Sequence, residues 1–83
     1  MSHTTEIRRE LTQGLLALAR ATKQDRVRDE IDQAIEALTG PETFRKVLRT
    51  VAERLAVIQS CAEGRVEQRV SELVRIVQAA LQQ

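Results

Sequence analysis

The chain has 83 residues, of which 13 are basic and 12 are acidic, giving a formal net charge of +1. This length allows one domain, spanning residues 1–83, with a core only marginally sufficient for independent folding. A hydrophobic content of 42% with 30% charged residues is too apolar for a disordered segment and too polar for a membrane protein. The near-zero net charge gives no general attraction to nucleic acid or to an anionic membrane.

The residue types indicate an all-α fold in a reducing compartment. Phe44 is the only aromatic residue, so the core must be built from Leu, Ile, Val and Ala, which suits helix packing better than a β-sandwich. Cys61 is the only cysteine and excludes an intrachain disulfide. Because the residues after Met1 are polar, we expect no signal peptide and a cytoplasmic location.

Two apolar stripes predict helices over about residues 5–21 and 24–38, and each stripe follows the helical repeat. The first consists of Ile7, Leu11, Leu15 and Leu18, and the second of Val27, Ile31, Ala34 or Ile35, and Leu38. The polar stretch between them contains neither glycine nor proline, so the helix could continue through it. Thr22 and Asp25 have capping-box spacing, which favours a break.

The segment Thr39, Gly40, Pro41 and Glu42 predicts a helix-reversing turn. Glycine suits a left-handed helix C-cap, proline suits the first turn of a new helix, and Thr39 with Glu42 has capping-box spacing. A third helix is predicted over about residues 42–61. Its apolar positions alternate steps of four and three, and they are Phe44, Leu48, Val51, Leu55, Ile58 and Ala62.

A fourth helical segment is predicted over about residues 65–82. Its stripe consists of Val66, Val70, Leu73, Val77 and Ala80 or Leu81. The steps before it fit either a stutter in one long helix or a break at Gly64, where Ser60 and Glu63 have capping-box spacing. If the first two segments and the last two are each continuous, the chain is an antiparallel helical hairpin. If both junctions break, it is a small up-down helical bundle.

Charge is distributed unequally about the predicted turn. Acidic residues predominate before it and basic residues after it, which predicts ion pairs between the two arms. In a hairpin centred on Gly40 and Pro41, Glu36 pairs with Arg45 and Asp32 pairs with Arg49. Exposed pairs contribute only about 0.2 to 1 kcal/mol each, so their expected role is to set register.

No catalytic residue, cofactor site or metal site is predicted. His3 is the only histidine, and Cys61 is expected to be a structural thiol. Asp25, Asp29 and Asp32 have helical spacing but are interleaved with arginines, so a solvated face is expected there. An alternative function, a small nucleic-acid-binding regulator, rests on the arginines Arg8, Arg9, Arg65 and Arg69, with Arg20 as a further candidate.

Two resemblances to known families bear on function. Residues 28–38 resemble the opening helix of all-helical chorismate mutases, but the match ends at Gly40 and Pro41 before a second arginine can appear, so no enzyme is predicted. The two amphipathic helices joined at the turn, with an aliphatic second helix, are similar to small needle co-chaperones of type III secretion. That resemblance implies a hairpin that binds a partner chaperone and keeps a needle subunit soluble, and it has no counterpart for residues 66–81.

The primary prediction is a small protein-protein interaction module, adaptor, chaperone-like or regulatory, that binds helix on helix and forms a homodimer. Four apolar residues lie off the main stripes: Leu16, Val57, Val74 and Ile76. Together with Leu81 they are predicted to anchor a partner. Gly14 lies on the apolar face of the first helix, where it either permits close approach of another helix or is merely tolerated.

Overall fold

The computed structural model describes residues 3–82, and the side chain of His3 lies outside the described part. Four helices account for almost all of this range: α1 (His3–Ala21), α2 (Asp25–Thr39), α3 (Phe44–Cys61) and α4 (Arg65–Leu81). No strand occurs between residues 3 and 82. The all-α prediction is therefore confirmed, and the chain forms the bundle rather than the long hairpin because it breaks at both doubtful junctions.

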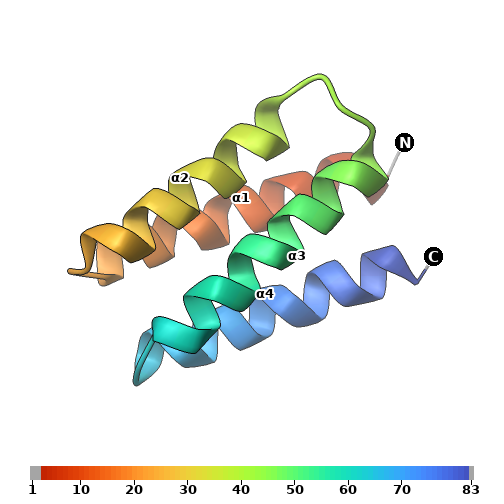
Figure 1. Ribbon diagram of the computed structural model, residues 1–83. Helices are drawn as coiled ribbons and strands as arrows, with labels where there is room; N and C mark the ends of the chain where they lie inside the picture. Colours follow the sequence, from red (N-terminus) through yellow and green to blue (C-terminus); the bar gives the residue numbers. More distant parts are fainter. Residues whose placement is uncertain (1–2, 83) are drawn as a thin grey trace.

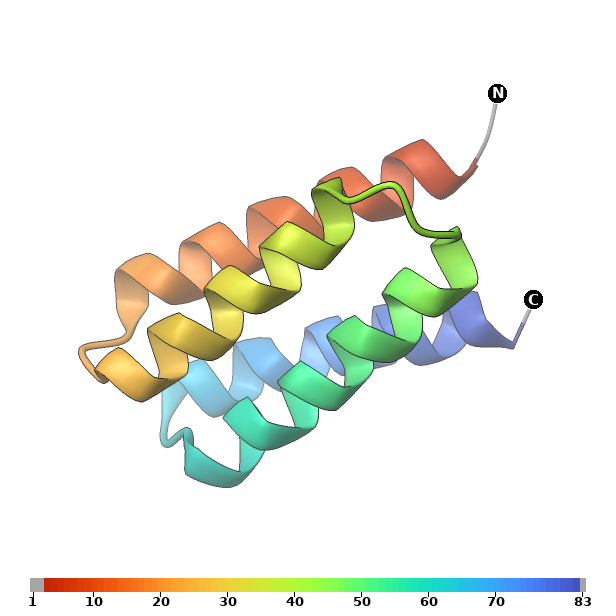
Figure 2. The same ribbon diagram turned by 45° about the horizontal axis from the view of Figure 1, so that its top comes forward.

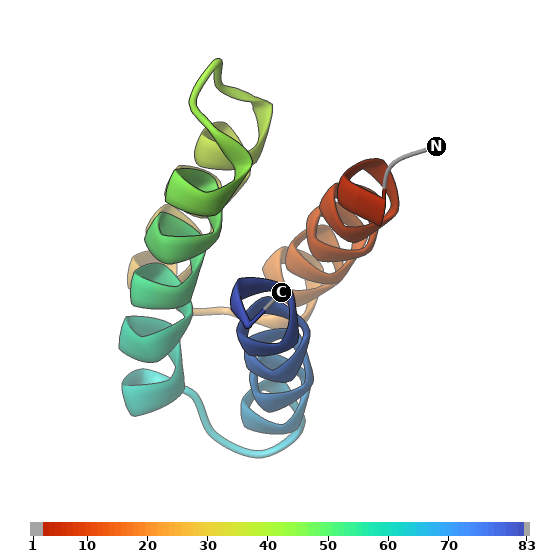
Figure 3. The ribbon, with the colours of Figure 1, turned by 90° about the vertical axis from the view of Figure 1, so that its right-hand side faces the viewer.

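The four helices form an up-down bundle in which each helix runs antiparallel to the next (Figures 1 and 2). Helix α1 packs against α2 and α4, and α3 packs against the same two helices. Seen nearly along the helices, α4 lies between α3 and α1 (Figure 3). The start of α1, the connection between α2 and α3, and the end of α4 share one end of the bundle.

The core is aliphatic, as predicted, and all four helices contribute to it. The buried apolar side chains are Leu11, Leu15 and Leu18 of α1; Val27, Ile31, Ala34 and Leu38 of α2; Val47, Leu48, Val51, Leu55 and Ile58 of α3; and Val70, Leu73 and Val77 of α4. The radius of gyration is 11.8 Å, the value expected of a compact chain of this length. The bundle thus closes a core of its own within one copy of the chain.

Helix α1 ends at Ala21 without glycine or proline, and Arg28 of α2 donates hydrogen bonds to two backbone carbonyls at this junction. The Nε of Arg28 donates to the carbonyl oxygen of Ala19 at 3.4 Å, and a terminal guanidinium nitrogen donates to that of Thr22 at 3.3 Å. The predicted capping box of Thr22 and Asp25 is wrong, since the N-cap of α2 is Gln24. Thr22 is buried, and its hydroxyl accepts a hydrogen bond from the backbone N–H of Gln24 at 3.2 Å.

The turn between α2 and α3 lies where the sequence predicted it, but its backbone conformation and capping hydrogen bonds differ from those predicted. Gly40 caps α2 with φ of −79° and ψ of 171°, an extended conformation rather than the predicted left-handed one. Helix α3 begins at Phe44 with Thr43 as its N-cap, so Pro41 and Glu42 precede the helix. The hydroxyl of Thr39 donates to the carbonyl of Glu36 at 3.0 Å instead of forming the predicted capping box.

The connection between α3 and α4 depends on Gly64. This residue is the N-cap of α4 and has φ of 65°, the only positive φ among residues 3–82. The predicted capping box of Ser60 and Glu63 is wrong because α3 continues to Cys61, and the Ser60 hydroxyl donates to the carbonyl of Val57 at 2.7 Å. A backbone with positive φ and ψ of −131° is accessible to glycine and strained for other residues.

The two loop glycines are therefore expected to respond in opposite ways to alanine. Gly64→Ala should destabilise the protein by about 1 to 2 kcal/mol because of its positive φ. Gly40→Ala should be neutral or stabilise by up to about 1 kcal/mol, because the backbone suits alanine and the new Cβ makes an ordinary 3.4 Å contact with the Glu36 carbonyl. Urea unfolding of both variants measures the difference, and equal losses would contradict this assignment.

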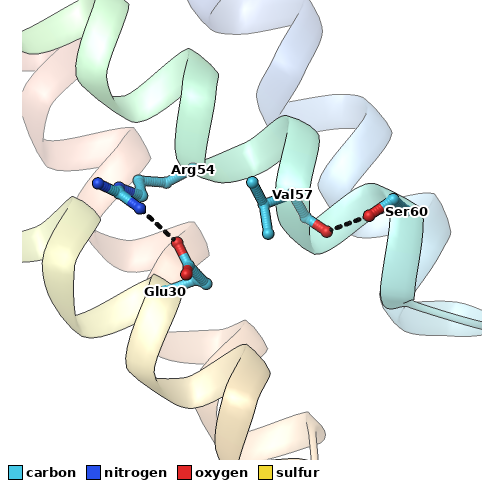
Figure 4. A network of polar contacts seen from close by, with 4 residues as sticks. All are labelled: Glu30, Arg54, Val57 and Ser60. Carbon is cyan, nitrogen blue, oxygen red and sulfur yellow. Dashed lines mark hydrogen bonds and ion pairs between the residues drawn. The ribbon is translucent and has the colours of Figure 1, made fainter.

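The predicted ion pairs Glu36–Arg45 and Asp32–Arg49 are not formed. Instead, a terminal guanidinium nitrogen of Arg54 lies 3.0 Å from a carboxylate oxygen of Glu30, and the two side chains point toward each other across α2 and α3 (Figure 4). The prediction assumed a tight turn, whereas four residues, 40–43, connect the helices and move each partner further along α3. The Nε of Arg54 is buried without a hydrogen-bond partner, so this pair adds little net stability.

Candidate protein-binding surface

The five predicted anchors do not come together in one patch. Val74 lies three residues after Ser71, whose hydroxyl accepts a hydrogen bond from the Gln59 side chain of α3, so Val74 is on the α3 side of α4. Ile76 lies three residues after Leu73, which faces Gly14 of α1, so it is on the opposite side of the same helix. Both are half-buried against the core.

The other three anchors lie on three further parts of the surface. Leu81 is half-buried against the core at the end of α4. Val57 is half-buried, three residues beyond Arg54, and thus lies on the α2 side of α3 (Figure 4). Leu16 is 46% exposed and is the one large apolar side chain of the described chain with such exposure. Of the five, Leu16 alone is mainly available to a partner.

Leu16 lies on the outer surface that α1 shares with α2. It is two residues beyond Gly14, which faces α4, so it points to the opposite side of α1. Arg9 and Arg20 are exposed at seven residues before and four residues after Leu16, which places them on the same stripe. The outward stripe of α1 is therefore a leucine flanked by two guanidinium groups.

Helix α2 presents a matching acidic stripe beside it. Arg28 reaches toward α1, and Asp25, Asp32 and Glu36 are three, four and eight residues away from it, hence on the α1 side of α2. Asp29 completes steps of four, three and four, and all four carboxylate residues are exposed. We call this surface the α1–α2 face, consisting of Arg9, Leu16, Arg20, Asp25, Asp29, Asp32 and Glu36.

The charged side chains of the α1–α2 face form no ion pair with another residue of the described part of the chain. The ion pairs of the described residues are Lys46–Glu42 at 3.8 Å and Arg54–Glu30, neither of which uses a residue of this face. Sequence reasoning treated the aspartates as a solvated face and paired Glu36 with α3. The signal that it missed is that α1 and α2 carry oppositely charged stripes at the same helical spacing.

A hollow of about 360 Å³ lies at the end of the bundle where α1 begins and α4 ends. Its lining is both polar and apolar, and it consists of Thr4, Phe44, Arg45, Leu48, Ala80 and Leu81. Arg8 crosses above the Phe44 ring, 5.4 Å from its centroid, and donates to the carbonyl oxygen of Leu38. This contact ties α1 to the ends of α2 and α3, so Arg8 has a structural role.

The arginines of the nucleic-acid alternative do not form one basic face. Arg65 and Arg69 line a shallow hollow on α4 together with Gln68 and Glu72. Arg8 is engaged at the opposite end of the bundle, and Arg9 belongs to the α1–α2 face. The arrangement thus separates the four residues into different environments.

No group of three or more His, Cys, Asp or Glu side chains could hold a metal ion between residues 4 and 82. Cys61 is half-buried, with its sulfur 3.7 Å from the Ser60 hydroxyl. Arg28, the residue that starts the chorismate mutase resemblance, donates to backbone carbonyls at the end of α1.

Over the described residues, no helix combines the length and apolarity needed to cross a bilayer.

Comparison of the chain with known protein families, with curated proteins and with solved structures gave no match.

Proposed function

We propose that the protein is a cytoplasmic interaction module that binds another protein chain helix on helix, through the α1–α2 face. The observation that carries this proposal is the exposure of Leu16, 46%, between charged residues that form no ion pair among the residues the structure describes. An apolar side chain bordered by charged groups has the arrangement of a protein interface, in which an apolar centre lies within a polar rim.

The composition of the buried core supports the same proposal. Leu15 and Leu18 are fully buried, and the bundle closes without Leu16. Leu16 is not part of the buried core, and about half of its surface is left exposed to solvent. The unpaired stripes on both sides of it would orient a docking helix by charge, since rim charges govern specificity and association rate.

A photo-crosslinking amino acid at position 16 tests the proposed function in the native cell. We expect irradiation to join the chain to another polypeptide, visible as a new band with a defined mass. The matched control carries the same amino acid at Ala56, which is exposed on α3 away from the α1–α2 face. Absence of a product from position 16, or equal products from both positions, contradicts the proposal.

A further inference from the structure

We infer that the partner of the α1–α2 face is a second copy of the chain, bound about a twofold axis parallel to the helices; this inference rests on the proposed function. Rotation about such an axis, placed midway between α1 and α2, lays α1 of one copy on α2 of the other. The basic stripe of each copy then meets the acidic stripe of its partner. One pair of stripes thus makes two equivalent contacts, as an isologous interface requires.

The heights of the charges along the helices fit this arrangement. Arg8 contacts the carbonyl of Leu38, so Arg9, its neighbour, is nearly level with Glu36. Arg28 contacts the carbonyl of Ala19, so Arg20 is nearly level with Asp29. An axis parallel to the helices preserves these heights. Arg9 of one copy therefore faces Glu36 of the other, and Arg20 faces Asp29.

Leu16 occupies the middle of the same contact. It lies between Arg9 and Arg20 along α1, and so it approaches the second copy between Asp29 and Asp32. There the aliphatic part of the partner's α2 side chains can cover it. Leu16 is then removed from water by the dimer, whereas the charges at its two ends set the register.

Charge also excludes the alternative twofold arrangement of this face. If the axis ran perpendicular to the helices, α1 would lie antiparallel on α1 of the second copy, with Leu16 against Leu16. Arg9 of each copy would then approach Arg20 of the other, and the carboxylates of the two α2 helices would also face one another. Like charges brought together across an interface are strongly unfavourable.

The size of the face suits a small dimer. The bundle measures 36 × 21 × 18 Å, so one of its long faces is comparable with the area of about 800 Å² per partner found in stable interfaces. The net charge of +1 adds little general repulsion between copies. Because most of the contact is ionic, association should weaken as salt rises from about 0.05 M to 0.5 M.

The test uses two charge-reversed variants of the full chain, Arg9→Glu/Arg20→Glu and Asp29→Arg/Glu36→Arg, in sedimentation equilibrium up to about 1 mM. The wild type is expected to dimerise. Each variant alone should have a dimer dissociation constant raised more than about tenfold, because positions 9 and 36 and positions 20 and 29, which face each other across the interface, then carry charges of the same sign. An equimolar mixture should form a heterodimer, since each acidic stripe then meets a basic one.

A control and a folding check accompany the variants. Arg45→Glu/Arg49→Glu reverses two exposed charges on α3, and it should leave the dissociation constant within about twofold of the wild type. Circular dichroism confirms that each chain is folded, and the mixture provides a second check because an unfolded variant cannot restore association.

A wild type that stays monomeric overturns the inference, as does a dimer that the face variants leave unchanged or a mixture that stays monomeric. These outcomes are distinguishable from failure of the proposed function. If the chain is monomeric but still crosslinks from position 16 to a different protein, the dimer inference is wrong and the proposed interaction function stands. If the chain neither dimerises nor crosslinks, both proposals are wrong.

Discussion

Gly14→Leu is expected to destabilise the bundle by about 3 kcal/mol, a large part of the stability of a chain this size. Gly14 of α1 faces the Leu73 side chain of α4. A Cβ at position 14 alone would overlap Cδ2 of Leu73 and lie 3.3 Å from its Cδ1 and Cγ. The gain in helix propensity over glycine, about 0.8 kcal/mol, cannot offset that overlap. Urea unfolding monitored by circular dichroism measures the loss.

Leu73→Ala provides the control for this explanation. By itself it should be destabilising, because it empties space in the core next to Gly14. Combined with Gly14→Leu, it should restore part of the lost stability, with a coupling of at least about 1 kcal/mol between the two positions. Additive losses would show that the loss does not come from contact with Leu73, and a Gly14→Leu variant as stable as the wild type would show that the glycine is merely tolerated, the other reading that the sequence allowed.

Leu15→Ala and Leu16→Ala should differ sharply although they are neighbours on α1. Leu15 is fully buried, so its truncation should lower the free energy of unfolding by about 2 to 5 kcal/mol. Leu16 is 46% exposed, and its truncation should change that free energy by no more than about 0.5 kcal/mol in the monomer. Thermal unfolding at a concentration below the onset of dimerisation compares the two.

Similar losses at both positions would mean that Leu16 contributes to the core and is not free to bind. With the expected difference, Leu16→Ala becomes a folded variant in which the proposed surface alone is altered. It should then reduce crosslinking and association without affecting the bundle.

Apolar periodicity predicted the helices and most of the core. Steps of three and four placed the buried leucines of α1 and the buried residues of α3 on one side of each helix, and burial follows the same repeat. Val47 was missed because it lies beside the predicted stripe, on the flank of α3 that also contacts the core. Packing against two neighbouring helices widens the buried face beyond a single stripe.

The connections were less predictable because their hydrogen bonds come from elsewhere in the fold. Arg28, which belongs to α2, donates to the carbonyl of Ala19 near the end of α1. Arg8, which belongs to α1, donates to the carbonyl of Leu38 near the end of α2. Local spacing cannot reveal such donors. The three capping boxes expected to start at Thr22, Thr39 and Ser60 fit the sequence pattern, yet none of the described N-caps makes a side-chain hydrogen bond.

The candidate surface was predictable only in part. Leu16 stood out in the sequence because it falls off the apolar stripe of α1. Val74, Ile76 and Leu81 also fall at the edges of their stripe, but the bundle covers these edges with neighbouring helices. The unpaired charges beside Leu16 required knowledge of which helices are adjacent, and in particular that the connection of residues 40–43 moves Glu36 away from Arg45.

The most direct measurement of the central claim is a series of ¹H–¹⁵N correlation spectra of the wild type at increasing concentration. If a second copy docks on the α1–α2 face, the amide shifts that depend on concentration will cluster at residues 9–20 and 25–36, while those of α3 and α4 stay constant. Shifts that cluster instead around the hollow lined by Phe44 and Leu81, or spectra that do not change up to about 1 mM, would contradict the account.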